Sequence, residues 1–458
     1  MEYLALGQAL HAFAMWPFAG TSPVTMGRRS KRYAIKNESS QRAEPPDQQS
    51  AIKTVLLASA VNSPVASRMA IRFAHAGCRV AAAFPSGAHL LSTTQAVAEQ
   101  HRYSIANPLD SLFSAIRSSK ASIVIPCDTL AARQLHALHG GLPAGGEQVS
   151  RTIERSLGDP TAFLVLDSRH EVQVAARMEG LDAAESYALG RATDPSALAQ
   201  SLEFPWILKT DYAWGGLGAR VVENLDEARE FIRRAGAPPG LGKALVRLTV
   251  HGDRSAMGDW LHDSGPGLSV QRPVPGQPAS IVAACWQGEV LALLAVEGLP
   301  PCEPSWPPAK VRIVEGGRME ETVRRMARRL GLSGFHEFRF VLESGTSRPW
   351  LTEINAHCAA PAHLNGGPGR DPVDAICRQM LGVSPPEPWP VHRESLVALF
   401  PQAWIANPDD PDLKTAAYDI PKEDPKLVAR ALQLASRGRQ YRSLRDRLRA
   451  LGKGGGPR

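Results

Sequence analysis

GFHEFRFVLESGTSRPWLTEIN, residues 334–355, is the segment from which the architecture of this chain is predicted most directly. FHEFRFVL and PWLTEIN alternate between apolar and polar residues, which predicts two antiparallel strands joined by the turn ESGTSR. If the hairpin is centred near Gly345, Glu337 lies directly opposite Glu353 on the same face of the sheet. Side chains paired in this way have Cβ atoms about 5 Å apart, and like charges at that separation repel each other.

Two facing carboxylates can be explained in two ways. A divalent cation would turn their repulsion into a binding site, because hard carboxylate oxygens suit Mg²⁺. Asn355 follows Glu353 by two residues, so it points to the same face and adds a neutral oxygen. The alternative is a pair of surface glutamates that Arg339 neutralises. Without a bound metal, the repulsion predicts that Glu353→Gln stabilises the protein.

A glycine-rich segment lies earlier in the chain. FPWILKTDYAWGGLGARVV, residues 204–222, predicts a strand that ends in Lys209, a glycine loop and a second strand. Gly215, Gly216 and Gly218 let the backbone adopt positive φ, so that its N–H groups can approach a phosphate. Lys209 would supply a point charge for the same phosphates. The alternative is a β-hairpin with a flexible loop and an exposed lysine; no Gly-Lys-Ser/Thr follows, so this is not a Walker A loop.

Further strands are predicted on either side of these segments. Residues 268–297 predict three strands separated by the turns PGQP and QGE, and periodicity alone indicates an antiparallel meander. Near the N-terminus, TVLLASA (54–60), RVAAAF (79–84) and SIVIPC (122–127) are short apolar runs, and a helix is expected from Pro64 to His75. This alternation predicts a doubly wound α/β arrangement.

The length of 458 residues predicts more than one domain. We expect a disordered N-terminal extension over residues 1–50, because residues 21–50 are polar, basic and rich in turn formers. An α/β domain is expected over 51–145, an α+β domain over 146–385, and a C-terminal extension with basic helices over 386–458. Linkers are predicted at GLPAGGEQ (141–148) and SPPEPWP (384–390).

Composition restricts the compartment and the partners. No run of about 18 apolar residues occurs, and no basic segment precedes the apolar residues 3–20, so we expect neither a membrane span nor a secretory signal. The six cysteines form no CxxC pair, which favours a reducing cytoplasm over disulfides or structural zinc. The net charge of +7 permits an anionic ligand or nucleic acid, but much of the positive excess lies at the two ends of the chain.

In this order and spacing, the three segments resemble the ATP-grasp superfamily over roughly residues 160–385. Residues 54–139 look like the α/β domain that precedes the grasp in those enzymes. The resemblance implies that the phosphates of ATP are held by Lys209 and by the loop with Gly215, Gly216 and Gly218. The resemblance is specific because it rests on several motifs that occur in the same order and spacing, rather than on one motif.

The resemblance also implies how adenine and metal are held. The Arg272 carbonyl would accept from the adenine amino group, the Val274 N–H would donate to the ring, and Gln271 would lie beside it. Members of the superfamily use paired acids and an E-x-N motif to hold one or two Mg²⁺ ions at the β- and γ-phosphates. These roles are carried over to Glu337, Glu353 and Asn355.

The sequence departs from the family pattern at two positions. Family members often follow E-x-N with proline and an arginine that contacts the phosphoryl group or the substrate, but here Ala356 and His357 follow. Arg169 stands where a phosphate-binding lysine is usual, and arginine can clamp phosphate in a bidentate manner. Lys310 and Arg312 are further candidates for triphosphate or acyl-phosphate contacts, with a solvated strand edge as the alternative.

The implied function is that of an ATP- and Mg²⁺-dependent ligase which joins a small-molecule carboxylate to an amine through an acyl-phosphate. A homodimer is left open. The main alternative is a non-catalytic ATP-binding sensor or regulatory protein that keeps the fold, because His357 replaces a commonly catalytic residue. A nucleic-acid binder is suggested by the arginine-rich C-terminal helices, but it is not expected, because only Tyr441 is interleaved among those arginines.

Overall fold

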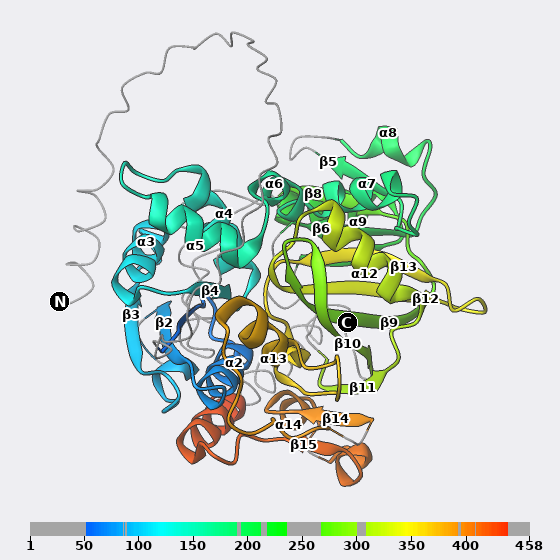
Figure 1. Cartoon of the computed structure of the whole chain (residues 1–458). Coiled ribbons are helices and arrows are strands. Elements are labelled where there is room, and N and C mark those ends of the chain that lie inside the picture. The colour runs from blue at the N-terminus through cyan, green and yellow to red at the C-terminus, as the bar shows by residue number, and fades with distance from the viewer. Residues whose placement is uncertain are drawn as a thin grey trace, which may run out of the picture. The chain divides into compact units, whose positions relative to one another are not determined.

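The computed structural model describes residues 52–85, 87, 89–189, 194–211, 218–235, 267–299, 308–392, 395–407 and 409–437. The predicted N-terminal extension, Gly215, Gly216 and the predicted C-terminal helix beyond residue 437 lie outside the described residues. The described part is a mixed α/β fold built on three sheets (Figure 1). None of its helices is long and apolar enough to cross a membrane.

The first sheet is parallel, with the strand order β3-β2-β1-β4. Its strands are β1 (Thr54–Ala58), β2 (Arg79–Pro85), β3 (Glu99–Tyr103) and β4 (Ile123–Pro126). The strands predicted from the three apolar runs are confirmed. The strand β3 was not predicted, because EQHRY is polar and its residues alternate between half-buried and exposed at the edge of the sheet.

Helices cover both faces of this sheet. They are α2 (Pro64–His75), α3 (Pro108–Ser119), α4 (Thr129–Gly140) and α5 (Glu147–Leu157). Successive residues of β1 point to opposite faces: Leu57 packs in one core with Phe73 of α2, and Leu56 packs in another with Ile153 of α5. The predicted start of α2 is confirmed. The Ser63 hydroxyl accepts a hydrogen bond from the Val65 N–H, and Pro64 occupies the first helical position. Helix α5 begins within the predicted linker and packs on the first sheet, and the domain boundary there stays a prediction.

The second sheet is antiparallel, with the order β5-β8-β6-β7. Its strands are β5 (Ser186–Leu189), β6 (Trp206–Thr210), β7 (Ala219–Val222) and β8 (Leu268–Gln271). The helices of this region are α6 (Phe163–Leu166), α7 (Arg169–Met178), α8 (Ser196–Ala199) and α9 (Leu225–Ala235). Trp206 and Leu208 of β6 pack against Phe231 of α9 and form a separate small core. The two strands predicted on either side of the glycine loop are confirmed as β6 and β7.

The third sheet has seven strands, in the order β13-β12-β9-β10-β11-β14-β15. Its strands are β9 (Gly276–Trp286), β10 (Glu289–Gly298), β11 (Lys310–Val314), β12 (Gly334–Glu343), β13 (Pro349–Asn355), β14 (Leu396–Leu399) and β15 (Ala417–Asp419). The helices around it are α12 (Arg318–Arg329), α13 (Pro372–Ile376) and α14 (Gln402–Ala406). Ala283 of β9 packs with Val323 of α12 on one face, and Val282 packs with Ile376 of α13 on the other. The last two strands come from the predicted C-terminal extension, so part of that extension completes the sheet.

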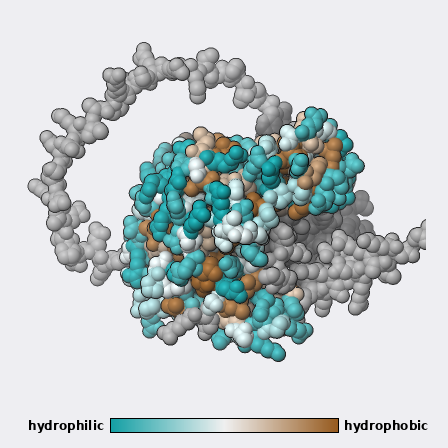
Figure 2. Space-filling view, turned by 90° about the vertical axis from the view of Figure 1, so that its right-hand side faces the viewer, coloured by the Kyte–Doolittle hydropathy of each residue, from teal (hydrophilic) through white to brown (hydrophobic). Residues whose placement is uncertain are grey.

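Short turns of helix join these elements. They are η1 (Leu90–Ser92), η2 (Pro160–Ala162), η4 (Ala360–His363), η5 (Cys377–Leu381) and η6 (Pro411–Lys414). Residues 425–437 are also helical, which agrees with the start of the predicted C-terminal helix. On the face seen in Figure 2, hydrophobic residues form small groups among hydrophilic ones.

The antiparallel meander considered for residues 268–297 is not what forms. Strand β8 pairs with β5 and β6 in the second sheet, whereas β9 pairs with β10 and β12 in the third. Residues 272–275 therefore cross from one sheet to the other. Periodicity could not reveal this, because it shows which residues share a face but not which strand is the partner.

Candidate active site

The hairpin of β12 and β13 brings the predicted acids together in a register that differs from the predicted one. Beyond a bulge at Thr352, Arg339 pairs with Glu353, and Glu337 pairs with Asn355. The prediction that Glu337 lies directly opposite Glu353 is therefore wrong. The two acids are diagonal neighbours, and Arg339 and Asn355 occupy the positions directly across from them.

The bulge explains why these four side chains share a face. Between the turn and the bulge, Phe340 pairs with Leu351, and both side chains are buried in the core beneath the sheet. If β13 continued in that register, Thr352 would face Arg339, and Glu353 would lie on the core side. Because the bulge absorbs Thr352, the polar residues after it stay on the face opposite the core.

Hydrogen bonds and ion pairs tie the acids to cationic neighbours. Arg339 Nε lies 2.9 Å from Glu337 Oε2, and Arg339 Nη1 lies 3.0 Å from Glu353 Oε1. Arg169 Nη1 lies 2.8 Å from Glu353 Oε2. Asn355 Nδ2 donates to Glu337 Oε2 at 2.8 Å and to Glu353 Oε1 at 3.2 Å. Both glutamates are buried, at 4% and 5% exposure, so they are not the surface pair of the alternative interpretation, although Arg339 does neutralise them.

The charges of this cluster shift one another's pKa values. Burial alone would raise the pKa of Glu353, but Arg169, Arg339 and Lys209 together hold it well below its usual range. Burial likewise opposes the charge of Arg339, yet the carboxylates of Glu337 and Glu353 raise its pKa above the ordinary value. Glu353 and Arg339 are therefore both charged at neutral pH.

Lys209 lies at the same cluster from the second sheet. It is buried near the end of β6, and its Nζ is 3.5 Å from the backbone oxygen of Thr352. Burial lowers its pKa to about 8, an effect that the charge of Glu353 offsets only in part. The backbone oxygen of Gly218 accepts from Thr210 N–H at 2.6 Å, which closes the described end of the glycine loop onto β6.

A cavity of about 480 Å³ opens over this cluster. Nine of the residues predicted for the site line it, namely Arg169, Lys209, Gln271, Arg272, Val274, Glu337, Glu353, Asn355 and His357. They come from α7, the second sheet, the crossing segment, the third sheet and the residues after β13, so segments nearly 190 residues apart in the chain meet here. The cavity is of the size that binds small ligands.

The lining of the cavity includes an unpaired polar atom. Gln271 is 3% exposed, and its Oε1 has no hydrogen-bond partner among the described residues. An unpartnered buried oxygen costs roughly 1–3 kcal/mol, so a donor from a ligand would be favoured there. The backbone N–H of Arg272 already donates to the backbone oxygen of Glu185 at 3.0 Å. Apolar side chains such as Ile207 and Phe340 line the same cavity. Such walls suit a flat heterocycle with an exocyclic amino group.

The first sheet contributes residues that sequence reasoning missed. Ser63, Asp128 and Thr129 line the cavity at the first turns of α2 and α4. His357 Nε2 lies 3.1 Å from Thr129 Oγ1, and His357 Nδ1 lies 3.1 Å from the backbone oxygen of Cys358. A carbonyl only accepts, so Nδ1 carries a proton, and Nε2 shares the second hydrogen bond with the threonine hydroxyl. The signal that could have found these residues is their place at the carboxyl ends of parallel strands, where ligands bind in open α/β sheets.

Two predicted residues are not brought to the cavity. Lys310 Nζ lies 2.8 Å from Asp410 Oδ2 and 2.5 Å from Asp412 Oδ2, and the side chain is buried by that contact. Arg312 is half exposed and lies 3.8 Å from Glu297. Neither residue lines the cavity. Lys310 therefore neither lies on a solvated strand edge nor lines the cavity, because Asp410 and Asp412 bind its side chain.

The donor chemistry of the acid cluster is compatible with Mg²⁺. Among the described residues, no group of three or more His, Cys, Asp or Glu side chains is suited to a metal. The predicted metal-binding residues Glu337, Glu353 and Asn355 instead offer two carboxylates and one carboxamide. Oxygen donors of this kind are those that Mg²⁺ prefers. Three of the four carboxylate oxygens accept from guanidinium or amide groups, so a cation would bind only if these donors turned away.

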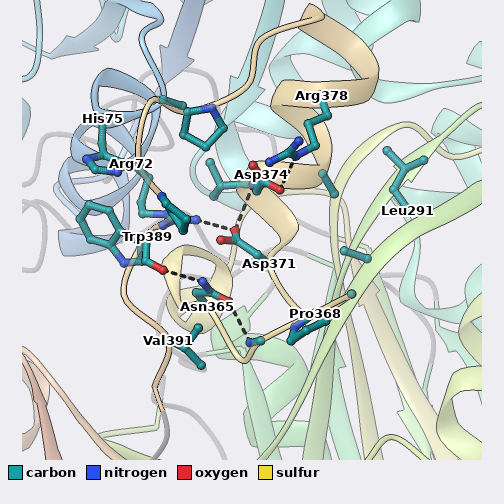
Figure 3. A pocket seen from close by; sticks show the side chains of 18 of the residues that line it. Arg72, His75, Leu291, Asn365, Pro368, Asp371, Asp374, Arg378, Trp389 and Val391 are labelled. Carbon is teal, nitrogen blue, oxygen red and sulfur yellow. Dashed lines mark hydrogen bonds and ion pairs between the residues drawn. The ribbon is translucent and has the colours of Figure 1, made fainter.

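A second cavity, of about 530 Å³, lies between α2, α13 and the loop that carries Trp389 (Figure 3). The Arg72 guanidinium lies 4.6 Å from the ring centroid of Trp389 and pairs with Asp371. Arg378 pairs with Asp374 at 2.7 Å. This cavity shares no lining residue with the first, and its charged side chains are paired with one another. We therefore restrict the candidate site to the first cavity.

Comparisons with known proteins support the sequence resemblance. Residues 168–248 match the family model described as the ATP-binding domain of the carbamoyl-phosphate synthase L chain. The fold is similar to N5-carboxyaminoimidazole synthetase from Staphylococcus aureus, at 13% identity and a TM-score of 0.50, over 74% of this chain and 80% of that one. It is also similar to an ADP complex of N5-carboxyaminoimidazole ribonucleotide synthetase, at 14% identity and a TM-score of 0.50, over 73% and 78% of the two chains. No curated protein matches the chain in sequence.

Proposed function

We propose that the chain is an ATP-grasp protein and an ATP-dependent ligase that joins a small carboxylate to a small amine. Support comes from the match of residues 168–248 to an ATP-binding domain model and from the similarity of the fold to the two synthetases. The observation that carries this proposal is the first cavity, whose lining includes both an unpaired buried acceptor and a cluster of charged side chains. The similar structure with bound ADP supports a nucleotide as the occupant.

The nucleotide would lie along the cavity. Gln271 Oε1 and the backbone of Arg272 and Val274 would bind the adenine, while Lys209 and Arg169 would contact the phosphates. Glu337, Glu353 and Asn355 would hold Mg²⁺, which supplies positive charge for the β- and γ-phosphates when it is bound.

The proposed chemistry has two steps. An oxygen of the substrate carboxylate attacks the γ-phosphorus, and the bond to the β-phosphate oxygen breaks, which gives an acyl-phosphate and ADP. The amine then attacks the acyl carbon, loses a proton, and inorganic phosphate leaves as the amide forms. The chain would contribute position and charge rather than a covalent nucleophile. The acceptor substrate would bind beside His357, Thr129 and Ser63, which line the same cavity.

One observation favours a second candidate, a nucleotide-binding sensor without catalysis. The two acids are held by guanidinium groups, and His357 is hydrogen-bonded to Thr129 rather than free in the cavity. Both candidates bind ATP, and they differ in turnover. Release of ADP in the presence of Mg²⁺ and a mixture of small carboxylates and amines supports the ligase. Binding of ATP with no release under any mixture supports the sensor.

The variant Lys209→Ala tests the cavity itself. We expect the loss of a charged hydrogen-bond partner to weaken ATP binding by roughly 1.5–3 kcal/mol, or about ten- to a hundredfold. Isothermal titration calorimetry measures the affinity, and circular dichroism checks that the variant is folded. Arg312→Ala is the matched control, because this cation lies off the cavity and should leave the affinity unchanged. Wild-type affinity in a folded Lys209→Ala variant would falsify the assignment of the phosphates to this cavity.

A further inference from the structure

We propose that Arg339 is a displaceable counter-cation, which holds the two predicted metal-binding acids until a nucleotide with its metal arrives and then contacts the phosphates instead. The proposal rests on the proposed function in one respect, that the ligand is a nucleotide. It assigns Arg339 a positioning role that the sequence did not suggest, because Arg339 was considered only as a neutralising partner of surface glutamates.

The register fixes where the Arg339 guanidinium can lie. Arg339 follows Glu337 by two residues on β12 and lies directly across from Glu353 on β13, so all three side chains leave the sheet on one face. Its Nε and Nη1 contact one oxygen of each acid, at 2.9 and 3.0 Å. One guanidinium thus bridges the two carboxylates that a metal ion would otherwise bridge.

The local charge opposes a metal ion that arrives alone. Arg339 pairs with both carboxylates, Arg169 pairs with Glu353, and the charge of Lys209 also acts on Glu353. A free divalent cation would have to displace a guanidinium without any new negative charge to replace the lost ion pair. A nucleotide brings several negative charges, which both attract the metal and give the displaced guanidinium a new partner.

Arg339 is better suited to this exchange than Arg169. The side chain of Arg339 is 39% exposed and that of Arg169 is 18% exposed, so moving Arg339 disturbs less of the interior. Arg169 contacts only Glu353 among the two acids, and its backbone is anchored by Asp211 Oδ1 at 3.0 Å. Arg339 lines the cavity, so its guanidinium stays within reach of a bound nucleotide after it leaves the acids.

The test is a pair of titrations on the full chain with Arg339→Met. In the first, Mn²⁺ is titrated without nucleotide, and the free ion is followed by electron paramagnetic resonance. In the second, ATP is titrated by calorimetry in the presence of EDTA. We expect the variant to bind Mn²⁺ at least about tenfold more tightly than wild type, and to bind metal-free ATP about tenfold more weakly. A merely structural role would not move the two affinities in opposite directions.

Arg348→Met is the matched control. Arg348 lies on the same hairpin and pairs with Asp182, and it does not line the cavity, so both affinities should equal those of wild type. The double variant Arg339→Met/Glu353→Gln should lose the gain in Mn²⁺ affinity if the gained site is this one. Arg339→Lys keeps a charge but cannot bridge both acids, so its Mn²⁺ affinity should rise by a smaller factor. This variant replaces Arg339→Met in the titrations if the Met variant does not fold.

Several results would overturn the proposal. Unchanged Mn²⁺ affinity in folded Arg339→Met or Arg339→Lys would show that the arginine does not compete with a metal. A gain that persists in the double variant would put the metal elsewhere. If wild type binds no ATP with or without Mg²⁺, the proposed function fails, while the Mn²⁺ titration still decides whether Arg339 is a counter-cation.

Discussion

Glu353 keeps its charge in the interior because three cations surround it. The expectation that Glu353→Gln stabilises the protein depended on a direct pairing with Glu337, and the register contradicts that pairing. We now expect Glu353→Gln to lower the free energy of unfolding at pH 7 by about 2 kcal/mol, because it leaves the partly exposed guanidinium groups of Arg169 and Arg339 short of a charged partner. Urea unfolding measures the difference between wild type and variant.

The sign of the pH dependence follows from the lowered pKa of Glu353. A carboxylate whose pKa is lower in the folded state adds stability above its unfolded-state pKa and loses it as the pH falls. The difference between wild type and variant should therefore be constant at neutral pH and shrink below pH 4.5, the ordinary value for this side chain. Glu289→Gln, at an exposed pair with Arg328, is the control and should change little. A difference that stays constant down to pH 3 would contradict the charge assignment.

The sequence predicted which residues belong to the site, but it did not predict which residues they contact. Lys209 and Glu353 were predicted because each belongs to a local motif with a characteristic spacing, whereas Gln271 was predicted only from the resemblance to the ATP-grasp superfamily. Lys310 had no such motif, and its partners Asp410 and Asp412 lie about a hundred residues later in the chain. Which partner a long side chain chooses depends on the fold rather than on its neighbours in sequence.

At the scale of the elements, the bulge of β13 is the feature most open to test. Deleting Thr352 removes the residue that the bulge absorbs, so the pairs of Arg339 with Glu353 and of Glu337 with Asn355 can form in a regular ladder. We therefore expect this deletion to keep the fold and most of the ATP affinity. Calorimetry and thermal unfolding measure both.

The matched variant inserts one alanine after Thr352. If β13 keeps its bulge, the insertion turns Glu353 toward the core, where Phe338 and Ile354 are buried. If the bulge closes into a regular ladder, Glu353 lies opposite Glu337 instead of Arg339. We expect loss of ATP binding and a lower melting temperature. Equal behaviour of the deletion and the insertion would mean that the register does not depend on the bulge.

The elements were predictable where the signal is local. Strands β1, β2 and β4 are short apolar runs, and the start of α2 is marked by Ser63 and Pro64. Strand β3 lacks such a signal because it is a polar edge strand. The change of sheet between β8 and β9 also has no local signal, since strand partners are set by contacts far apart in the chain.

At the scale of the whole molecule, a buried ion pair joins the two ends of the described chain. Arg68 of α2 pairs with Asp419 of β15, and His363 Nε2 lies 2.8 Å from the other oxygen of Asp419. Burial lowers the pKa of His363, so the neutral ring donates to the carboxylate and Arg68 carries the charge. We expect Asp419→Ala to lower the free energy of unfolding by about 3–5 kcal/mol, because it leaves a buried arginine unpaired. Urea unfolding tests this, with the exposed Asp409→Ala as control; equal effects would contradict it.

The crossing segment 272–275 has a mechanical consequence. It tethers β8, an inner strand of one sheet, to β9, an inner strand of another, and residues on both sides of it line the cavity. Pro273 and Pro275 fix two of its φ angles, so twisting between the sheets is confined to few torsions. A ligand that bridges the cavity walls would stiffen this joint. When the two sheets are pulled apart in an optical trap, the rupture force should therefore rise with nucleotide concentration.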